Sequence, residues 1–291
     1  MAARTETRFM LMTRPELDHA PPRWIRAAGG VRVEIGATAR GSAPIRVAER
    51  GGYRVRFVGG ARRGEPLCEG VYLNTGGGLA GGDSLGLDVV LAAGTRATLT
   101  TQAAEKIYRA QGDDTTIRVD LELGAGAALD WLPQEQILFD GARLARTIDV
   151  SLAADSRLLL VEGCVFGRLA MGETMREGML RDRWRVRRAG RLVFAEDVRL
   201  EGAVSEALAR PACGAGARAL ATVLLVSPDA EGRVEEARAA LRDAGAECAA
   251  GGVDGMLLAR FVAGDPQRLR ADLARFLERL SGRPLPRSWS T

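Results

Sequence analysis

Apolar and polar residues alternate with a period of two along much of the chain between about residues 31 and 200. The clearest case is the segment 115–123, in which four apolar residues share one face: Ile117, Val119, Leu121 and Leu123. Most residues between them are charged, as in a strand with one buried and one solvent-exposed face. No segment in this range keeps the 3.6-residue period of an amphipathic helix. The pattern therefore predicts a mainly β fold.

The β-rich region also contains an internal sequence repeat with a period of about 30 residues. The segment LAAGTRATL, ending at Leu99, aligns with LELGAGAAL, ending at Leu129, and with SLAADSRLL, in which Leu158 takes the matching place. Two further pairs follow the same spacing: Ile107-Tyr108 with Leu138-Phe139, and residues 117–121 with 148–152. Strand units that cannot bury their own faces stack on one another. The repetition thus predicts a solenoid-like, β-helical body.

The pattern changes after a linker at 206–217. Four elements are expected there: a buried strand at 218–227, a helix at 229–245, a strand or hairpin at 252–264 and a second helix at 265–282. Asp265, Pro266 and Gly282 suit the N-cap, the first position and the end of that second helix. We therefore predict an N-terminal arm (1–30), a β-rich body (31–210) and a C-terminal α+β element with two helices (211–291), in one continuous domain.

Composition argues against a tight metal site and against catalysis by a histidine or cysteine. His19 is the single histidine, and the four cysteines form no C-x-x-C pair. We expect no catalytic residues, no bound cofactor and only weak, carboxylate-type metal binding. The N-terminus lacks the apolar region of a signal peptide, and no run of residues is long and apolar enough to span a membrane. A cytoplasmic protein without membrane contact is expected.

The net charge of +4 comes with interspersed signs, and Lys106 is the single lysine among many arginines. The densest basic stretch, residues 181–191, alternates in the manner of a strand with a solvated face, although a surface for an acidic partner stays open. Nucleic-acid binding would require interleaved aromatic residues for base stacking, and only Trp184 lies in this stretch. We expect no nucleic-acid partner.

The glycine-rich stretch from Gly76 to Gly82 contains the letters G-x-G-x-x-G, the pattern of a dinucleotide-binding turn. That turn requires a helix immediately after it, so that the helix N-terminus faces the phosphates. Here Leu85, Leu87 and Val89 alternate with other residues, which predicts a strand instead. A tight loop joining two strands is the favoured interpretation. An enzyme or binding protein that uses this loop for a nucleotide or anion is the alternative.

Several stretches mix polar and apolar residues more tightly than packing alone requires: TGGGLAGGD, TTQAAEKIYRA, WLPQEQILFDGA, EGCVFGRLAMGE and the tail RPLPRSW. Taken in this order, from RVEIGATAR to the tail, they resemble the UreD (UreH) family of urease accessory proteins over nearly the whole chain. One departure is Asn74 and Thr75 in the glycine-rich stretch, where proline is usual beside the glycines.

The resemblance implies a β-rich scaffold, not an enzyme, which binds urease apoprotein and UreF, and through UreF the GTPase UreG, so that nickel reaches the urease active site. It also implies a water-filled channel through the protein. Seven residues of the matched stretches are candidates for that channel or for a polar network: Asp83, Lys106, Glu135, Asp140, Glu162, Arg168 and Glu173. Oxygen ligands and water would pass nickel on without trapping it.

Two interpretations of these candidates stay open. In the first, Asp140, Glu162 and Glu173 form a ladder of oxygen ligands on neighbouring repeat units along an internal path. In the second, the carboxylates pair with basic residues inside the β body, because buried charges require partners. The basic residues expected for that pairing are Lys106, Arg143 and Arg168.

Overall fold

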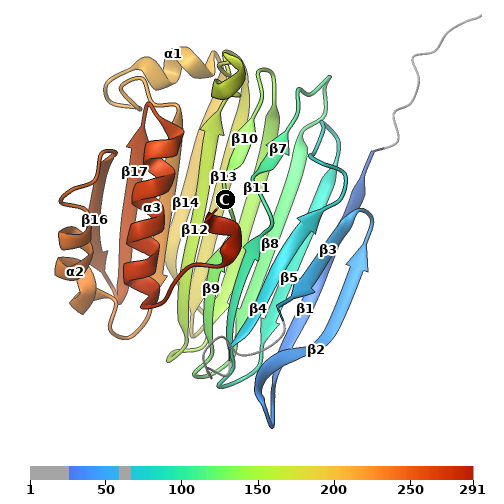
Figure 1. Cartoon of the computed structure of the whole chain (residues 1–291), viewed down its shortest axis with the longest axis vertical. Coiled ribbons are helices and arrows are strands. Elements are labelled where there is room, and N and C mark those ends of the chain that lie inside the picture. The colour runs from blue at the N-terminus through green and yellow to red at the C-terminus, as the bar shows by residue number, and fades with distance from the viewer. Residues whose placement is uncertain (1–25, 59–66, 291) are drawn as a thin grey trace, which may run out of the picture.

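A computed structural model describes residues 26–58 and 67–290 as two β-sheets that pack face to face. The seven-stranded sheet has the order β14 (Arg191–Gly202), β13 (Gly178–Arg188), β11 (Arg143–Leu152), β8 (Thr115–Leu123), β5 (Ser84–Leu91), β1 (Ala28–Thr38), β2 (Gly41–Arg50). The ten-stranded sheet has the order β16 (Glu247–Val253), β17 (Met256–Ala263), β15 (Ala219–Val226), β12 (Arg157–Phe166), β9 (Ala128–Leu132), β6 (Arg96–Thr101), β4 (Cys68–Asn74), β3 (Tyr53–Phe57). Two short strands, β7 (Glu105–Ile107) and β10 (Gln136–Leu138), complete it (Figure 1).

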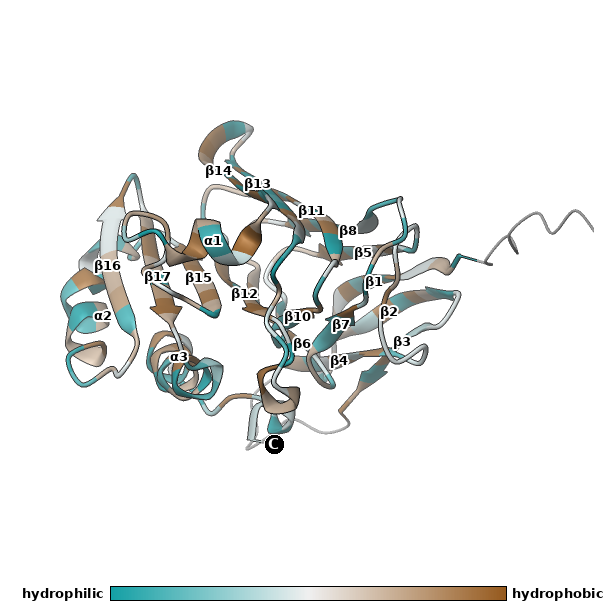
Figure 2. Cartoon of the chain, turned by 90° about the horizontal axis from the view of Figure 1, so that it is seen from above, coloured by the Kyte–Doolittle hydropathy of each residue, from teal (hydrophilic) through white to brown (hydrophobic). Residues whose placement is uncertain are grey.

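The chain crosses repeatedly from one sheet to the other, which confirms the predicted solenoid-like body. β5, β8 and β11 pair in parallel in the seven-stranded sheet, while β6, β9 and β12 pair in parallel in the ten-stranded one. The turns between the sheets stack as well, since Ala128 N donates to Thr95 O and Arg157 N donates to Ala127 O. Figure 2 shows the two layers end on.

The observed strand register differs by two residues from part of the alignment made on the sequence. Ile107 does pair with Leu138, and Leu129 with Leu158, as expected. However, Ile148 pairs with Val119 rather than with Ile117, and Leu99 pairs with Trp131 rather than with Leu129. A shift of two residues keeps every side chain on its own face, so alternation cannot detect it. In the true register, Arg146 lies opposite Ile117.

Two hydrophobic clusters form the core, one between the two sheets and one between the ten-stranded sheet and α3 (Pro266–Ser281). The larger one fills the space between the sheets, with Trp131, Phe166 and Trp184 among its largest fully buried side chains. The smaller one lies on the outer face of the ten-stranded sheet, beneath α3. Phe276 of α3 packs against Phe261 there, with ring centroids 5.3 Å apart. The ten-stranded sheet is therefore apolar on both faces wherever α3 covers it.

The C-terminal element has both predicted helices, although the first is shorter than expected. α3 begins where predicted, because the Asp265 carboxylate accepts a hydrogen bond from Gln267 N at 2.9 Å, and it ends at Gly282. The segment expected to be helical at 229–245 forms a 3-10 turn (Glu231–Arg233) and then α2 (Val234–Ala240). The remaining α-helix, α1 (Val204–Ala209), lies partly in the expected linker.

Strands β15, β16 and β17 extend the ten-stranded sheet, since β15 pairs antiparallel with β12. The C-terminal element and the β body therefore share one sheet. Most of the predicted N-terminal arm, including His19, lies outside the described residues, and β1 already begins at Ala28. None of the described helices has the length and apolar character needed to cross a membrane.

Candidate functional site

The glycine-rich stretch forms a loop between β4 and β5, as the favoured interpretation predicted, and a strand follows it rather than a helix. Its amides are largely used within the protein: Leu79 N donates to Lys106 O at 2.8 Å, and Gly82 N to Asp114 O at 3.2 Å. The Asp83 carboxylate is buried and accepts hydrogen bonds from Ala27 N and Ala80 N, both at 2.7 Å. Asp83 therefore holds the loop against the start of β1.

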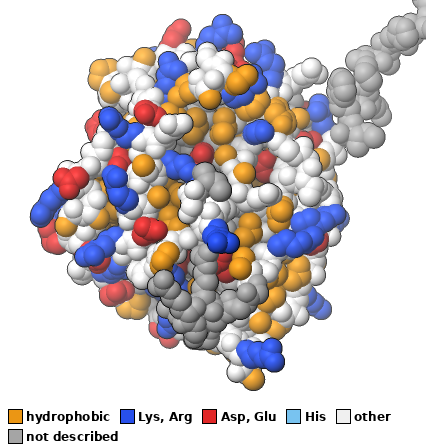
Figure 3. Space-filling view, in the orientation of Figure 1, with side chains coloured by type: hydrophobic (Ala, Val, Ile, Leu, Met, Phe, Trp, Pro, Cys, Tyr) orange, Lys and Arg blue, Asp and Glu red, His pale blue; other side chains and the backbone are white. Residues whose placement is uncertain are grey.

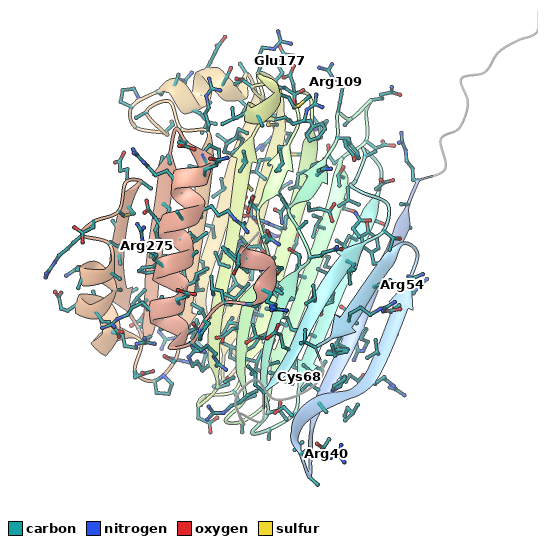
Figure 4. All side chains as sticks on the ribbon, in the orientation of Figure 1. Arg40, Arg54, Cys68, Arg109, Glu177 and Arg275 are labelled. Carbon is teal, nitrogen blue, oxygen red and sulfur yellow. The ribbon has the colours of Figure 1, made fainter. Side chains whose placement is uncertain are left out.

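Loops from successive repeat units gather at one end of the sandwich, which we call the loop edge: residues 75–83, 108–114, 139–142 and 167–177. Arg109 and Glu177 mark this end in Figure 4, opposite Arg40 and Cys68. A stack of side chains links the loops. The Tyr108 hydroxyl donates to Gly77 O at 2.9 Å, the Tyr108 and Phe139 rings meet edge to face at 5.1 Å, and the Arg168 guanidinium lies 4.3 Å from the Phe139 ring centroid.

Three of the predicted carboxylates lie at the loop edge, namely Asp83, Asp140 and Glu173. Asp140 accepts from the Arg176 amide at 2.8 Å and the Glu177 amide at 3.2 Å, and its other oxygen contacts the guanidinium groups of Arg176 and Arg109 at 2.9 and 3.3 Å. Burial alone would raise the pKa of the Asp140 carboxyl, but these bonds outweigh it, so the pKa lies below its usual range.

Glu173 forms a two-bond pair with Arg168, at 2.8 and 2.9 Å, within the same loop. That pair holds the pKa of the Glu173 carboxyl below its usual range. Both groups keep substantial solvent exposure, with Arg168 42 % and Glu173 23 % exposed at the side chain. The pair is therefore within reach of a partner or a hydrated ion.

Glu135 lies on the outer face of the ten-stranded sheet, against the C-terminal tail. It pairs with Arg270 of α3 at 2.8 Å, and the same guanidinium contacts Gln134 Oε1 at 2.8 Å and the Trp289 carbonyl at 3.3 Å. The Trp289 indole N–H donates to Leu132 O at 3.0 Å. Glu135 thus helps to fix the tail on the sheet.

Glu162 belongs to a charged cluster between the two sheets, which we call the inter-sheet cluster: Arg146, Glu162, Asp182, Gln136, Trp131 and Trp184. Arg146 reaches from β11 and bonds both Asp182 oxygens, at 2.9 and 2.6 Å. The same guanidinium bonds Glu162 and Gln136 of the opposite sheet. Arg146 is 2 % and Glu162 4 % exposed. The guanidinium therefore joins the sheets in the buried interior.

Indole groups complete the inter-sheet cluster. Trp131 Nε1 donates to Glu162 at 3.1 Å, and Trp184 Nε1 donates to Asp182 at 2.9 Å. Burial raises the pKa of the Glu162 carboxyl above its usual range, although the Arg146 guanidinium lowers it. The cluster places two carboxylates on one guanidinium. Hydrogen bonds from the guanidinium and the two indole groups offset the repulsion between these carboxylates and the cost of removing them from water.

Sequence reasoning missed Arg146 and Asp182. The signal that could have revealed Arg146 is its place on the inward face of an otherwise apolar strand, between Leu144 and Ile148. Asp182 lies in the arginine-rich stretch, whose exposed face was expected correctly, since Arg181 and Arg183 are exposed and Trp184 is buried. A charged residue on a buried face requires a partner, which would have directed attention to Glu162.

The predicted carboxylates therefore do not line up along one internal path. Glu162 lies inside the sandwich, Asp83, Asp140 and Glu173 at the loop edge, and Glu135 on the outer face. Of the expected basic partners, Arg168 pairs with a candidate carboxylate, whereas Arg143 pairs with Asp114 at 2.6 Å. Lys106 forms no ion pair with a described residue. Within residues 26–58 and 67–290, no three His, Cys, Asp or Glu side chains are grouped to hold a metal.

Comparisons with known proteins give a consistent result over this whole structure. The family described as UreD urease accessory protein matches residues 27–290. A urease accessory protein UreD of Azorhizobium caulinodans is 48% identical over 269 residues, which cover 92% of this chain and 98% of the relative. A urease accessory protein UreD of Methylobacterium sp. (strain 4-46) is 46% identical over 286 residues, covering 94% and 99%. The matched region includes both the inter-sheet cluster and the loop edge.

Proposed function

The chain belongs to the UreD family of urease accessory proteins, and we propose that it acts in the cytoplasm as a non-catalytic scaffold for urease maturation. In this role it binds urease apoprotein and UreF, and through UreF the GTPase UreG, so that nickel is delivered to the urease active site. The observation that carries the proposal is the family match across residues 27–290. The two packed sheets suit a scaffold, because their hydrogen-bonded strands support the loops of the loop edge rigidly.

Nickel is cargo in this proposal, held briefly by oxygen ligands and water. The exposure of the Arg168–Glu173 pair supports the loop edge, rather than the inter-sheet cluster, as the place where a hydrated ion meets this chain. A cation entering the inter-sheet cluster would compete with the Arg146 guanidinium for both Glu162 and Asp182. That competition disfavours transit through the cluster.

The test is co-expression of this chain with UreF, UreG and the urease subunits. A stable complex that contains this chain and raises urease activity is expected. Asp140→Leu and Glu173→Ala separate the two interpretations of the carboxylates: normal complex formation with impaired activation supports a nickel role, whereas loss of the folded complex supports a purely structural one. Normal activation in both variants would remove these residues from any nickel path.

Two measurements on the isolated chain complete the test. Equilibrium dialysis against Ni²⁺ should give only weak binding, because the described residues offer no grouped ligands. Titration with a labelled nucleotide should give no binding, because the amides of the glycine-rich loop are largely bonded within the protein. Saturable nucleotide binding that is lost on substitution in this loop would restore the alternative of a nucleotide-binding protein.

A further inference from the structure

A pocket of about 200 Å³ opens between the sheets at the edge distant from α3, and we call it the Glu105 pocket. Its apolar wall comes from β1 and β5 and consists of Val31, Leu85 and Leu87. Its polar lining comes from the ten-stranded sheet and includes Tyr53, Tyr72, Asn74, Gln102 and Glu105. Arg54, which also lines it, is labelled beside β3 in Figure 4.

Glu105 differs from the buried acidic groups elsewhere in the protein. Five carboxylates of the interior pair with arginine: Asp130, Asp140, Glu162, Asp182 and Asp272. A sixth, Asp83, is bonded to two backbone amides instead. The Glu105 side chain accepts a hydrogen bond from Asn74 Nδ2 at 2.9 Å, and the backbone amide and the ammonium group of Lys106 also favour its charged form. It forms no ion pair with any described residue. Burial raises the pKa of its carboxyl to about 6. The pocket thus contains a carboxylate that is not held in an ion pair, although Lys106 lies nearby.

Tyr72 supplies a second unsatisfied group in the same pocket. The residue is 5 % exposed, and within the described residues its hydroxyl is buried without a hydrogen-bond partner. Leaving a buried hydroxyl unpaired is unfavourable, because the group loses its hydrogen bonds to water. Because an arrangement of this kind is rare in native interiors, the hydroxyl and the carboxylate both point to a hydrogen-bond donor that enters from outside.

We propose that the Glu105 pocket receives an arginine or lysine side chain of a partner protein in the assembly described above. The charge of Glu105 matches a cationic head group, and the hydroxyls of Tyr53 and Tyr72 can accept its remaining N–H bonds. The aliphatic stem of such a side chain suits the wall of Val31, Leu85 and Leu87. This inference rests on the proposed scaffold function, because it requires a protein partner.

Two basic groups at the pocket mouth would repel a cation that enters, so removing one of them provides an additional test. Lys106 is exposed and lines the pocket, and Arg54 is held nearby by Glu49 at 3.6 Å. Tyr53 and Tyr72 are the other ionisable groups of the lining, and burial raises the pKa of both phenols. Lys106→Ala should therefore strengthen binding of a cationic probe, whereas Glu105→Gln should weaken it.

The first experiment uses Nα-acetyl-arginine methylamide as a probe on the purified chain, with the neutral citrulline analogue as the matched control. At pH 7.5 the arginine probe should bind at least about tenfold more tightly than the citrulline one, because charge recognition is required. At pH 5 its binding should weaken by about tenfold, since a carboxyl with a pKa of about 6 is then about one-tenth ionised.

Glu105→Gln should abolish both the preference for the arginine probe over the citrulline probe and the pH dependence of binding. Tyr72→Phe should weaken binding of the arginine probe by about two- to tenfold, which corresponds to the loss of one hydrogen bond. Glu122→Gln, on the exposed face of β8, is the control and should change nothing. Equal binding of the arginine and citrulline probes would overturn the inference. Binding of free agmatine at least about tenfold more tightly than the arginine probe would also overturn it, because the pocket would then be a small-molecule site.

The second experiment measures the affinity of this chain for purified UreF and for purified urease apoprotein. Glu105→Gln should weaken binding to one of them by at least about tenfold, as expected when a desolvated charge pair loses one member, and Glu122→Gln should not. If the wild-type chain binds neither protein, the scaffold function fails. If it binds and Glu105→Gln binds equally well, this inference alone fails.

Discussion

The inter-sheet cluster and the loop edge use the same chemistry, carboxylates held by arginine, in two different surroundings. Arg146 and Glu162 are 1% and 3% exposed at their side chains, whereas Arg168 and Glu173 are 42% and 23% exposed. A charge pair in the buried interior requires hydrogen-bond partners, because any unpaired charge there is costly. An exposed pair contributes little to stability and stays free to exchange partners.

The difference between the two regions indicates how the molecule divides its tasks. The inter-sheet cluster ties β11 and β13 of one sheet to β10 and β12 of the other. The loop edge presents Arg109, Arg168 and Arg176 to solvent on loops that the aromatic stack holds in place. Figure 3 shows both signs of charge interspersed with apolar groups over the face that carries α3. The charged groups inside are therefore bonded to one another, whereas the arginines of the loop edge stay exposed.

The largest expected effect follows from breaking the inter-sheet cluster. Arg146→Met leaves Glu162 and Asp182 buried without their cation, so the free energy of unfolding should fall by about 3–5 kcal/mol. Urea denaturation followed by tryptophan fluorescence measures this change. Arg183→Met, on the exposed face of β13, is the control and should change stability by less than about 0.5 kcal/mol. Equal stability of both variants would show that the cluster is not a buried charge network.

The glycine-rich loop should show a similar contrast between two of its residues. A Cβ at Gly81 would lie 2.6 Å from the Asp113 carbonyl oxygen, so Gly81→Val should cost about 3 kcal/mol or more and reduce the yield of folded protein. Gly77 has φ of +75° but open space around it, so Gly77→Ala should cost only about 1–2 kcal/mol. Thermal unfolding compares the two. The reverse order would contradict the packing of this loop against residues 110–113.

At the loop edge, Asp140→Asn should lower the free energy of unfolding by about 1.5–3 kcal/mol, the range for hydrogen bonds to a charged group. The pKa of the Asp140 carboxyl is lowered in the folded protein. The stability that Asp140 contributes is therefore present above its pKa in the unfolded chain, about 3.9, and is lost as the pH falls through its pKa in the folded protein. The difference between wild type and variant should therefore be large at pH 7 and shrink on acidification. A difference that grows on acidification would contradict this assignment.

Glu105 should show the opposite pH dependence. Its pKa is raised to about 6, so the stability that it contributes is fully present below the unfolded value of about 4.3 and is lost as the pH rises through about 6. Glu105→Gln should therefore gain stability relative to wild type between about pH 4.5 and pH 7, by an amount on the order of 1 kcal/mol. Urea unfolding at several pH values measures it, and a constant difference would place Glu105 in solvent.

The smallest effect is expected for the exposed pair at the loop edge. Glu173→Gln should change the free energy of unfolding by about 0–1 kcal/mol, because Arg168 stays solvated without it. Any effect should appear instead in urease activation by the co-expressed complex. A loss of more than about 2 kcal/mol in chemical denaturation would mean that the pair is structural, and it would remove the contrast with the inter-sheet cluster.

The sequence by itself determined the mainly β class, the repeat and the face on which most side chains lie. Alternation reports local geometry, so 115–123 could be assigned to a strand, and Asp265, Pro266 and Gly282 marked the ends of α3. Local signals failed where they were weak: the strand β16, with the sequence ECAAGGV, has small residues in place of an apolar stripe, and only its end, from residue 252, was assigned to a strand or hairpin.

Only the tertiary structure decided which charges meet. The two-residue shift of register, which alternation cannot detect, places Arg146 opposite Ile117 and within reach of Glu162 on the other sheet. The seven candidate residues were visible as charged positions in matched stretches, but their separation into interior, loop edge, outer face and the mouth of the Glu105 pocket depends on how the strands stack. The Glu105 pocket arises in the same way, since β1, β4 and β7 lie far apart in the sequence and line one cavity only in the folded sandwich. Periodicity is a property of one segment, whereas partner choice is set by the packing of several.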